Sequence, residues 1–361
     1  MQRRDFLGRC ALSSLALGIM PGTLFAQETI ALAMAGYPYD HVRALMTGDV
    51  TIAGCDVDFS VDKIGNLNTH IFEGPQTRGV SEVGLSPFML ATAIDQFDDY
   101  ALLPVFPLRT FRHKSIFVNA DAGIEHPSDL KGKRVGTPGY SSTSLTWIRG
   151  VLQDEYGVTP RDVEWVVSAV DSGKALSGQV SKNENVLPEG LSVSTGPAGK
   201  DESQMLVDGD VDALFHALEP QAFVVGDPRV KRLFADPRAT EQDYFRRTGI
   251  FPIMHAVAIR RDLAEASPWV PRAVFDGYVA ARNQAYAQLR KQWYFRTLPW
   301  AAQELEATRD LMGDNFFPYG IEANRTALET LFRYSHEQGL ASRRLSIEEL
   351  FLPESLTFAD G

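Results

Sequence analysis

The stretch that decides the fold is HPSDLKGKRVGTPGYSSTSLTWIRG, residues 126–150. Ser128 begins a short helical turn, a Lys-Gly-Lys turn follows, and residues 134–137 have the composition of a strand. A row of hydroxyl side chains then leads into a helix that we expect from about Ser142 to Tyr156. A strand, a tight turn and a helix in this order are the repeating unit of α/β proteins.

The same alternation continues on both sides of this stretch. We expect strands at residues 29–34, 57–61, 80–86, 100–106, 163–167, 213–215 and 255–259, and helices at 87–95, 268–289, 299–312 and 322–339. Strands that alternate with helices predict a mostly parallel sheet with helices on its faces. Residues 168–200 are rich in Gly, Ser, Lys and Asn, which indicates a long, exposed excursion from the sheet.

The N-terminal segment determines where we expect the protein to work. It begins with Arg3-Arg4-Asp5-Phe6-Leu7 and continues through a weakly apolar run to Ala26. Paired arginines before such a run are typical of a twin-arginine export signal, and the run is too short to span a bilayer. We therefore expect residues 1–26 to be a signal peptide, and residues 27–361 to be exported, already folded, to the periplasm without a membrane anchor.

The balance of charge restricts the partners of the protein. The chain has 46 acidic and 35 basic residues, which gives a formal net charge of −11 at pH 7. An acidic protein is a poor partner for nucleic acid and for anionic lipid, so we expect neither. A small organic anion remains a suitable ligand, because a local group of Arg, His and helix amides can dominate one pocket.

The sequence lacks the familiar motifs for metals and cofactors. Of its two cysteines, Cys10 lies in the expected signal, so Cys55 is left without a partner for a disulfide or a Cys-rich zinc site. The histidines show no His-x-x-x-His spacing, and we infer no metal. Walker A, Gly-x-Gly-x-x-Gly and Gly-x-Ser-x-Gly patterns are missing, which disfavours nucleotide-binding proteins and hydrolases. We therefore expect no cofactor.

The row of hydroxyl side chains at the helix start is the first candidate binding site. Free backbone amides and the helix dipole make the first turn of a helix an anion pocket, and hydroxyl groups add donors. Helix capping alone would explain one Ser or Thr but not several in a row. The candidate ligand contacts here are Tyr140, Ser141, Ser142 and Thr143.

A cationic segment that follows the strand at 100–106 is the second candidate. Arg109 and Arg112 could grip a carboxylate with two parallel hydrogen bonds, although a run of charges is more commonly a solvated face. His113, His216 and His255 each lie near the end of an expected strand, where α/β clefts form. The alternative for each histidine is a structural hydrogen bond.

Three loop residues after other strands complete the candidate set. Asp40 follows the first strand and Ser86 follows the third, while Tyr37 could stack on an aromatic ligand. The alternatives are an Asx turn for Asp40, a helix N-cap for Ser86 and rim packing for Tyr37.

Residues 126–136, with the hydroxyl-rich helix start after them, resemble the type II periplasmic solute-binding proteins. Within that superfamily the sequence is most similar to the 4,5-dihydroxyphthalate decarboxylase-like group. The stretches that carry this closer resemblance are residues 104–107 with 111–113, 147–150, 153–158, 246–255 and 334–340.

The resemblance implies a two-lobed α/β fold of the periplasmic-binding-protein type II class, with a ligand cleft between the lobes. The chain would cross between the lobes twice, near residues 118–121 and 251–255. Lobe 1 would then hold residues 27–118 and 254–361, and lobe 2 residues 119–253. In such proteins the ligand contacts both lobes and favours a hinge-closed state.

The resemblance leaves two functions open. The first is an exported solute-binding protein that captures an organic, preferably aromatic, carboxylate and passes it to an ABC-type membrane permease. The second is a cofactor-free decarboxylase for 4,5-dihydroxyphthalate or a related acid. In that enzyme His113 or His255 would be the acid, His216 the base, and Arg112 would orient the remaining carboxylate. The export signal favours the carrier.

Overall fold

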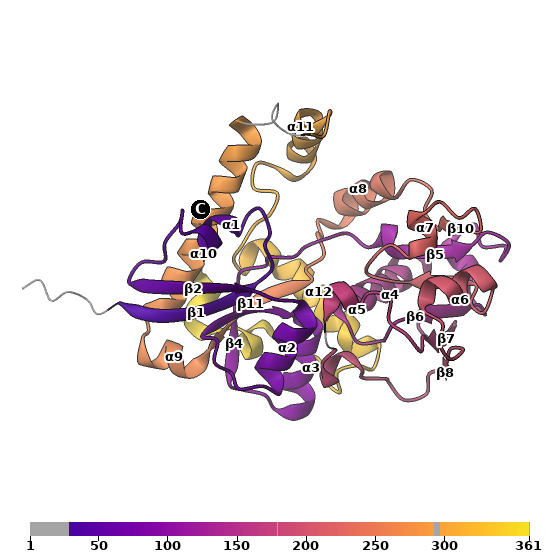
Figure 1. Ribbon diagram of the computed structural model, residues 1–361, viewed down its shortest axis with the longest axis horizontal. Coiled ribbons are helices and arrows are strands. Elements are labelled where there is room, and N and C mark those ends of the chain that lie inside the picture. The colour runs from indigo at the N-terminus through magenta and orange to yellow at the C-terminus, as the bar shows by residue number, and fades with distance from the viewer. Residues whose placement is uncertain (1–28, 179, 292–296, 361) are drawn as a thin grey trace, which may run out of the picture.

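A computed structural model describes residues 29–178, 180–291 and 297–360 of the chain. The expected signal peptide, residues 1–26, lies outside the described residues. Figure 1 shows two lobes side by side, and each lobe is built on its own β-sheet. The two-lobed α/β class expected from the sequence is thus confirmed. Within the described ranges, none of the helices combines the length and the apolar character that crossing a bilayer requires.

The first lobe is built on a five-stranded sheet with the strand order β2-β1-β3-β11-β4. Strand β1 pairs in parallel with β2 and β3, whereas β11 runs antiparallel to β3 and β4. The strands are β1 (Ile30–Gly36), β2 (Cys55–Val61), β3 (Val80–Gly84), β4 (Tyr100–Leu103) and β11 (His255–Arg260). Every residue of the central strand β3 is buried, so its one charged residue, Glu82, lies inside the lobe.

The second lobe is built on a six-stranded sheet with the order β10-β5-β9-β6-β7-β8. Strands β9, β6, β7 and β8 are parallel, and β5 runs antiparallel to β9 and β10. The strands are β5 (Ile116–Asn119), β6 (Arg134–Thr137), β7 (Glu164–Val167), β8 (Val193–Thr195), β9 (Ala213–Phe215) and β10 (Val230–Arg232).

Helices cover both sheets, as Figure 1 shows. The described α-helices are α1 (Arg43–Thr47), α2 (Ile64–Phe72), α3 (Leu85–Asp95), α4 (Thr143–Tyr156), α5 (Lys174–Ser177), α6 (Glu202–Asp208), α7 (Gln221–Val224), α8 (Pro237–Thr248), α9 (Arg261–Ala266), α10 (Val270–Lys291), α11 (Ala301–Met312), α12 (Arg325–Glu337) and α13 (Ile347–Leu350). Short 3₁₀ turns are η1 (His113–Ser115), η2 (Pro127–Leu130), η3 (Lys182–Glu184), η5 (Glu322–Asn324) and η6 (Pro353–Thr357).

Both sheets are mostly parallel, as expected, and β5 and β11 are the strands that run antiparallel to their neighbours. Each of these strands arrives from the other lobe, so no crossover helix forces it to run parallel. The described residues of 168–200 form a long and largely exposed excursion, as expected, and they contain α5, η3 and strand β8, which pairs with β7.

The two crossings between the lobes lie side by side. Arg109 pairs with Ile253 in an antiparallel bridge, and the Met254 amide donates to the Leu108 carbonyl at 2.8 Å. Strand β5, which the expected boundary at residue 118 would divide, pairs entirely within the second sheet. We therefore propose that the first crossing lies upstream of that boundary, at about residues 107–112.

Helix α4 belongs to the cores of both lobes. Leu145 and Ile148 pack in the core of the second lobe, whereas Trp147 and Val151 pack in a core of the first lobe. The Trp147 indole Nε1 donates to the Ile253 carbonyl at 2.9 Å. Four residues of one helix thus join the two lobes by apolar contact, and the indole adds a buried hydrogen bond.

Close packing against α12 fixes the position of α4. Gly150 lies under the ring of Tyr334, where a Cβ atom would come within 2.1–2.4 Å of the ring carbons. The Tyr334 hydroxyl donates to Asp154 Oδ2 at 2.7 Å, which holds the ring in this place. Because no heavier residue fits at position 150, the distance between α4 and α12 is set by the glycine.

We expect Gly150→Ala to lower the free energy of unfolding by about 1–3 kcal/mol, because the added methyl group would overlap the Tyr334 ring. In an unobstructed helix interior the same change would raise it by roughly 1 kcal/mol. Urea unfolding of the two proteins gives the difference. In a Tyr334→Ala background the destabilisation by Gly150→Ala should disappear, and the change should become neutral or stabilising. An alanine variant at least as stable as the parent would contradict this packing.

His113 is a core residue at the start of η1. It is 3% exposed, and its ring lies 5.3 Å, centroid to centroid, from Phe234 and from Tyr244. Its Nδ1 has no hydrogen-bond partner among the described residues. Burial lowers the pKa of His113 to about 4. The imidazole is therefore neutral in the folded protein near pH 7.

The buried neutral imidazole predicts that the protein loses stability in acid. Unfolded His113 would titrate near the usual pKa of about 6.5, so unfolding takes up a proton between that pH and about 4. The free energy of unfolding should fall by up to roughly 3 kcal/mol across this window as the pH is lowered. His113→Gln should reduce that slope in urea unfolding, and His126→Gln, at an exposed histidine, should not. Equal slopes for parent and His113→Gln would exclude this assignment.

Candidate functional site

The candidate site is a cavity of about 410 Å³ at the junction of the lobes. Tyr37, Tyr39 and His255 line it from the first lobe, and Arg112 lines it from the first crossing. The second lobe contributes the start of α4, the segment after β7 and the segment after β9. The cavity therefore lies where the carboxyl ends of parallel strands meet, as is usual for ligand sites in α/β proteins.

A buried carboxylate and a histidine form a pair in the first-lobe wall. His255 Nδ1 lies 2.6 Å from Glu82 Oε1. The Tyr39 hydroxyl donates to the same oxygen at 2.7 Å, and the Tyr37 amide donates to Oε2 at 2.8 Å. Burial, with the Glu82 carboxylate beside it, raises the pKa of Tyr39 far above its usual value. Tyr39 is thus a permanent donor, and the pair fixes the orientation of the His255 ring.

A second histidine faces the cavity from the second lobe. His216 is 3% exposed, and its Nδ1 lies 2.9 Å from the Leu218 carbonyl oxygen. Its Nε2 lies 4.0 Å from Asp171 Oδ1, and both residues line the cavity. The two lobes therefore each present one imidazole with a carboxylate nearby.

Arg112 supplies a buried positive charge. Its Nη1 donates to the Ala217 carbonyl at 3.0 Å, and its Nε lies 3.4 Å from Met254 Sδ. No carboxylate of the described residues lies within ion-pair distance of it. Burial lowers the pKa of Arg112 to about 10, which still leaves it a cation at neutral pH. A buried cation that contacts a neutral carbonyl and a thioether is suited to an incoming anion.

The start of helix α4 faces the same cavity. Ser142, Thr143, Ser144 and Leu145 all line it. Ser142 caps the helix, because its hydroxyl accepts from the Leu145 amide at 3.4 Å. The Thr143 hydroxyl accepts from the Ser86 amide at 2.9 Å, so it serves to join α4 to α3. The amide end of α4 and Arg112 together form an anion-binding wall.

Residues 171–178 and 180–185 cover the cavity, although many of their side chains are also exposed, as expected. Gly173, Leu176, Ser177, Val180, Glu184 and Asn185 of this segment line the cavity. The Tyr37 hydroxyl donates to the Leu176 carbonyl at 3.2 Å, and Lys182 Nζ lies 2.9 Å from Asp95 Oδ2. The segment therefore reaches from the second lobe onto the first and closes the cavity between them.

Six residues expected at the site do not line this cavity. The expected contacts that do line it are Tyr37, Arg112, Ser142, Thr143, His216 and His255. The others are placed elsewhere: Asp40, Ser86, Arg109, His113, Tyr140 and Ser141.

Their placements have clear physical reasons. Tyr140 is fully buried under the Arg149 guanidinium, 3.7 Å above its ring. The Ser141 hydroxyl donates to the Asn183 carbonyl at 2.9 Å. Arg109 donates to the Phe251 carbonyl at 2.7 Å and, with Asp40, lines a separate cavity of about 250 Å³. These side chains hold the structure around the site.

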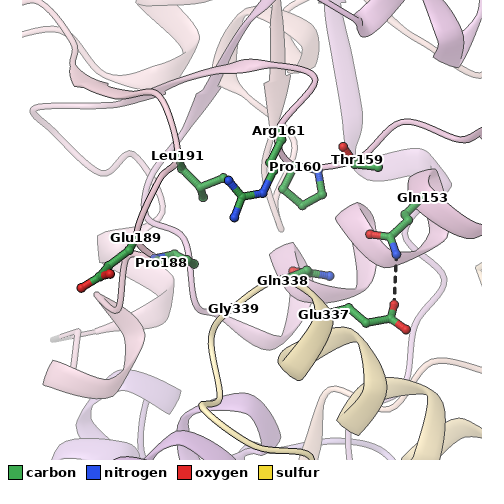
Figure 2. Close-up of a pocket in the computed structure, with 10 residues that line it drawn as sticks. All are labelled: Gln153, Thr159, Pro160, Arg161, Pro188, Glu189, Leu191, Glu337, Gln338 and Gly339. Atoms are coloured by element: carbon green, nitrogen blue, oxygen red, sulfur yellow. Dashed lines mark hydrogen bonds between the residues drawn. The ribbon is translucent and has the colours of Figure 1, made fainter.

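A larger cavity of about 560 Å³ lies apart from the site, beside the end of α4 (Figure 2). Gln153 and Glu337 point toward each other across it and form a hydrogen bond of 3.0 Å. Arg161 donates to the Gly190 carbonyl at 3.2 Å. None of its described lining residues is a histidine, and none of the expected site residues lines it. It lacks the chemistry that the cleft cavity concentrates.

Sequence reasoning missed Glu82 and Asp171. Glu82 is the one carboxylate in the apolar sequence of strand β3. An acidic residue in a buried strand usually has a partner, so this pattern could have marked Glu82 as a functional candidate. Asp171 lies in a stretch rich in small and polar residues, where nothing marks one carboxylate above another.

Comparisons with known proteins identify relatives of two kinds. A family model described as NMT1/THI5 like matches residues 98–182. A 4,5-dihydroxyphthalate decarboxylase from Comamonas testosteroni is 36% identical over 328 residues, which cover 91% of this chain and 98% of that protein. A protein of the same name from Pseudomonas putida is 34% identical over 215 residues, 60% of this chain and 81% of that one.

The fold has relatives among transport proteins. The periplasmic aliphatic sulphonate binding protein SsuA from Escherichia coli has a TM-score of 0.52 with 15% identity, covering 89% of this chain and 97% of SsuA. This likeness shows the fold, which is that of the two-lobed periplasmic binding proteins. The identity of over a third across nearly the whole Comamonas protein shows the closer kinship, and the chain belongs to the 4,5-dihydroxyphthalate decarboxylase family.

Proposed function

We propose that the protein is a decarboxylase for an aromatic dicarboxylic acid that carries ring hydroxyl groups, such as 4,5-dihydroxyphthalate. The observation that carries this proposal is the buried Glu82–His255 pair, which faces the same cavity as Arg112. A positioned imidazole and a fixed cation are what proton transfer to a bound aromatic carboxylate requires. The names of the two relatives from Comamonas and Pseudomonas support the same chemistry.

The cavity suits such an acid in size and in lining. About 410 Å³ is within the usual range for sites that hold a small molecule. Tyr37, Leu108 and Leu176 offer apolar surface to a ring, and Arg112 with the α4 amides offers donors to one carboxylate. His216 and Asp171, which also line the cavity, are placed to hydrogen-bond the ring hydroxyl groups.

The reaction follows from these positions. Arg112 and the start of α4 hold the carboxylate that stays on the ring. A hydroxyl group para to the other carboxylate transfers its proton to the Asp171 carboxylate, which lines the same cavity. The resulting phenolate raises the electron density at the carbon that bears that other carboxylate, and it takes the proton back once carbon dioxide has left. His255 then donates a proton to this carbon. The bond to the carboxylate breaks, its electron pair returns to the ring, and carbon dioxide leaves. Glu82 stabilises the imidazolium before the transfer.

An exported carrier is the second candidate. The likeness of the fold to SsuA and the N-terminal pattern at residues 1–26 favour this reading. The protein would then bind an organic carboxylate in the periplasm and deliver it to an ABC-type permease. The packing of α4 in both lobes favours the enzyme, because wide hinge opening would expose Trp147 and Val151 to water.

Incubation with 4,5-dihydroxyphthalate separates the two candidates. We expect release of carbon dioxide and formation of 3,4-dihydroxybenzoate. Liquid chromatography measures the amount of 3,4-dihydroxybenzoate over time. His255→Gln should lower kcat by about 10²–10⁴-fold, because it removes the proton donor. His126→Gln, at an exposed histidine, should leave the rate unchanged. Tight binding of the acid without any product would contradict the enzyme and support the carrier.

Arg112 should control affinity for the acid. Arg112→Lys keeps a positive charge but loses the forked donor geometry, so we expect the Kd of a bound aromatic dicarboxylate to rise by about 10–100-fold. Calorimetric titration of both proteins measures this change. Arg43→Lys, at an exposed arginine of α1, is the matched control and should bind as the parent does. Unchanged affinity for Arg112→Lys would place the carboxylate elsewhere.

A further inference from the structure

We propose that Asp171, Glu202 and His216 bind a divalent metal ion, such as Mn²⁺, in the second-lobe wall of the cleft cavity. One ligand atom from each residue lies within 4.8 Å of the other two. Two carboxylate oxygens and one imidazole nitrogen form a suitable ligand set for such an ion. Asp171 and His216 line the cavity, so the unfilled coordination positions would face it.

The fold brings these three residues together from distant parts of the chain. Asp171 follows β7 and His216 follows β9, and both strands run parallel to β6 between them. A bridge between Val170 and Asp201 places Asp171 beside Glu202, the first residue of α6. The three ligands therefore meet at one edge of the sheet.

The groups around the ligands orient them as in a metal site. His216 Nδ1 lies 2.9 Å from the Leu218 carbonyl, so a proton on this nitrogen leaves Nε2 free for a metal. The Leu218 amide nitrogen also lies 2.9 Å from Nδ1. A cation at Nε2 would select the tautomer that carries its proton on Nδ1. The Ser168 hydroxyl donates to Glu202 Oε1, and the Ser172 amide donates to Oε2 at 3.0 Å. Ligating carboxylates are commonly held by such donors.

The charges around the cavity call for a cation. Glu202 is fully buried, and the ion pair that Asp171 forms among the described residues is the one with His216 at 4.0 Å. Asp171 and Glu184 both line the cavity, where Arg112 is the only lysine or arginine of the described lining. A dianionic acid carries two negative charges, and Arg112 with the α4 amides balances the carboxylate that they hold. A divalent ion would add positive charge to this wall. This part of the inference rests on the proposed function: the ion would coordinate two neighbouring ring hydroxyl oxygens of the bound acid.

Titration of chelator-treated protein with Mn²⁺ tests the site, with free Mn²⁺ followed by electron paramagnetic resonance. We expect one tight site per chain in the parent. Asp171→Asn and Glu202→Gln should each weaken Mn²⁺ binding by at least about tenfold. Glu189→Gln makes the same carboxylate-to-amide change at an exposed residue outside this cavity and should bind Mn²⁺ as the parent does.

Circular dichroism verifies that each variant folds. If the buried change Glu202→Gln prevents folding, Asp171→Asn, at a partly exposed residue, still tests the site. A parent without tight Mn²⁺ binding, or an Asp171→Asn protein with parental affinity, would overturn the proposed site. Turnover that persists in chelator would then leave the decarboxylase proposal standing. Tight Mn²⁺ binding with no turnover of 4,5-dihydroxyphthalate would overturn the decarboxylase and retain the metal site.

Discussion

The approach of the α4 backbone to the Tyr334 ring is the constraint on which the rest of the structure depends. Gly150 allows the two helices to touch, and Trp147, one turn earlier, reaches the Ile253 carbonyl. Ile253 lies two residues before His255, so the contact that joins the lobes also ties the first-lobe imidazole to helix α4. The amide end of the same helix forms the anion-binding wall. One helix therefore sets both the distance between the lobes and the geometry of the cavity.

Each lobe alone carries half of the chemistry. The first lobe holds a carboxylate and an imidazole in direct contact, and Glu82 is buried in its central strand. The second lobe holds His216 with two carboxylates at the edge of its sheet. Arg112 lies on the crossing between them and contacts both, through Ala217 and Met254. His255, Arg112 and His216 line one cavity because the chain crosses twice beside it.

The sequence was sufficient for features that depend on local pattern. The helix expected from Ser142 to Tyr156 is α4, with Ser142 as its cap. His216 and His255 were predicted because each lies near the end of an expected strand, and Arg112 because a cationic segment follows one; all three line the cavity. Local pattern does not say which way a side chain points. Tyr140 and Ser141 lie at the correct helix start but are turned into the second lobe.

The remaining features depend on contacts between distant residues. His255 and Glu82 are 173 positions apart, and no spacing rule links them. The cover at 171–185 has the composition of an exposed loop, and its contacts with Asp95 and Tyr37 arise only when both lobes are assembled. Composition records how polar a segment is, whereas its burial depends on what the rest of the chain brings to it.

The origin of that cover has a consequence for how this family can diversify. The segment connects β7 to β8 and contributes nothing to the Glu82–His255 pair or to the packing of α4 under Tyr334. Changes of length within residues 172–178 and 180–185 carry a small entropic penalty and leave Glu82 and His255 in place. Lineages could therefore vary this part of the cover to accept a longer or differently substituted ligand. Asp171, at the β7 end of the segment, is the residue that such exchanges would have to keep.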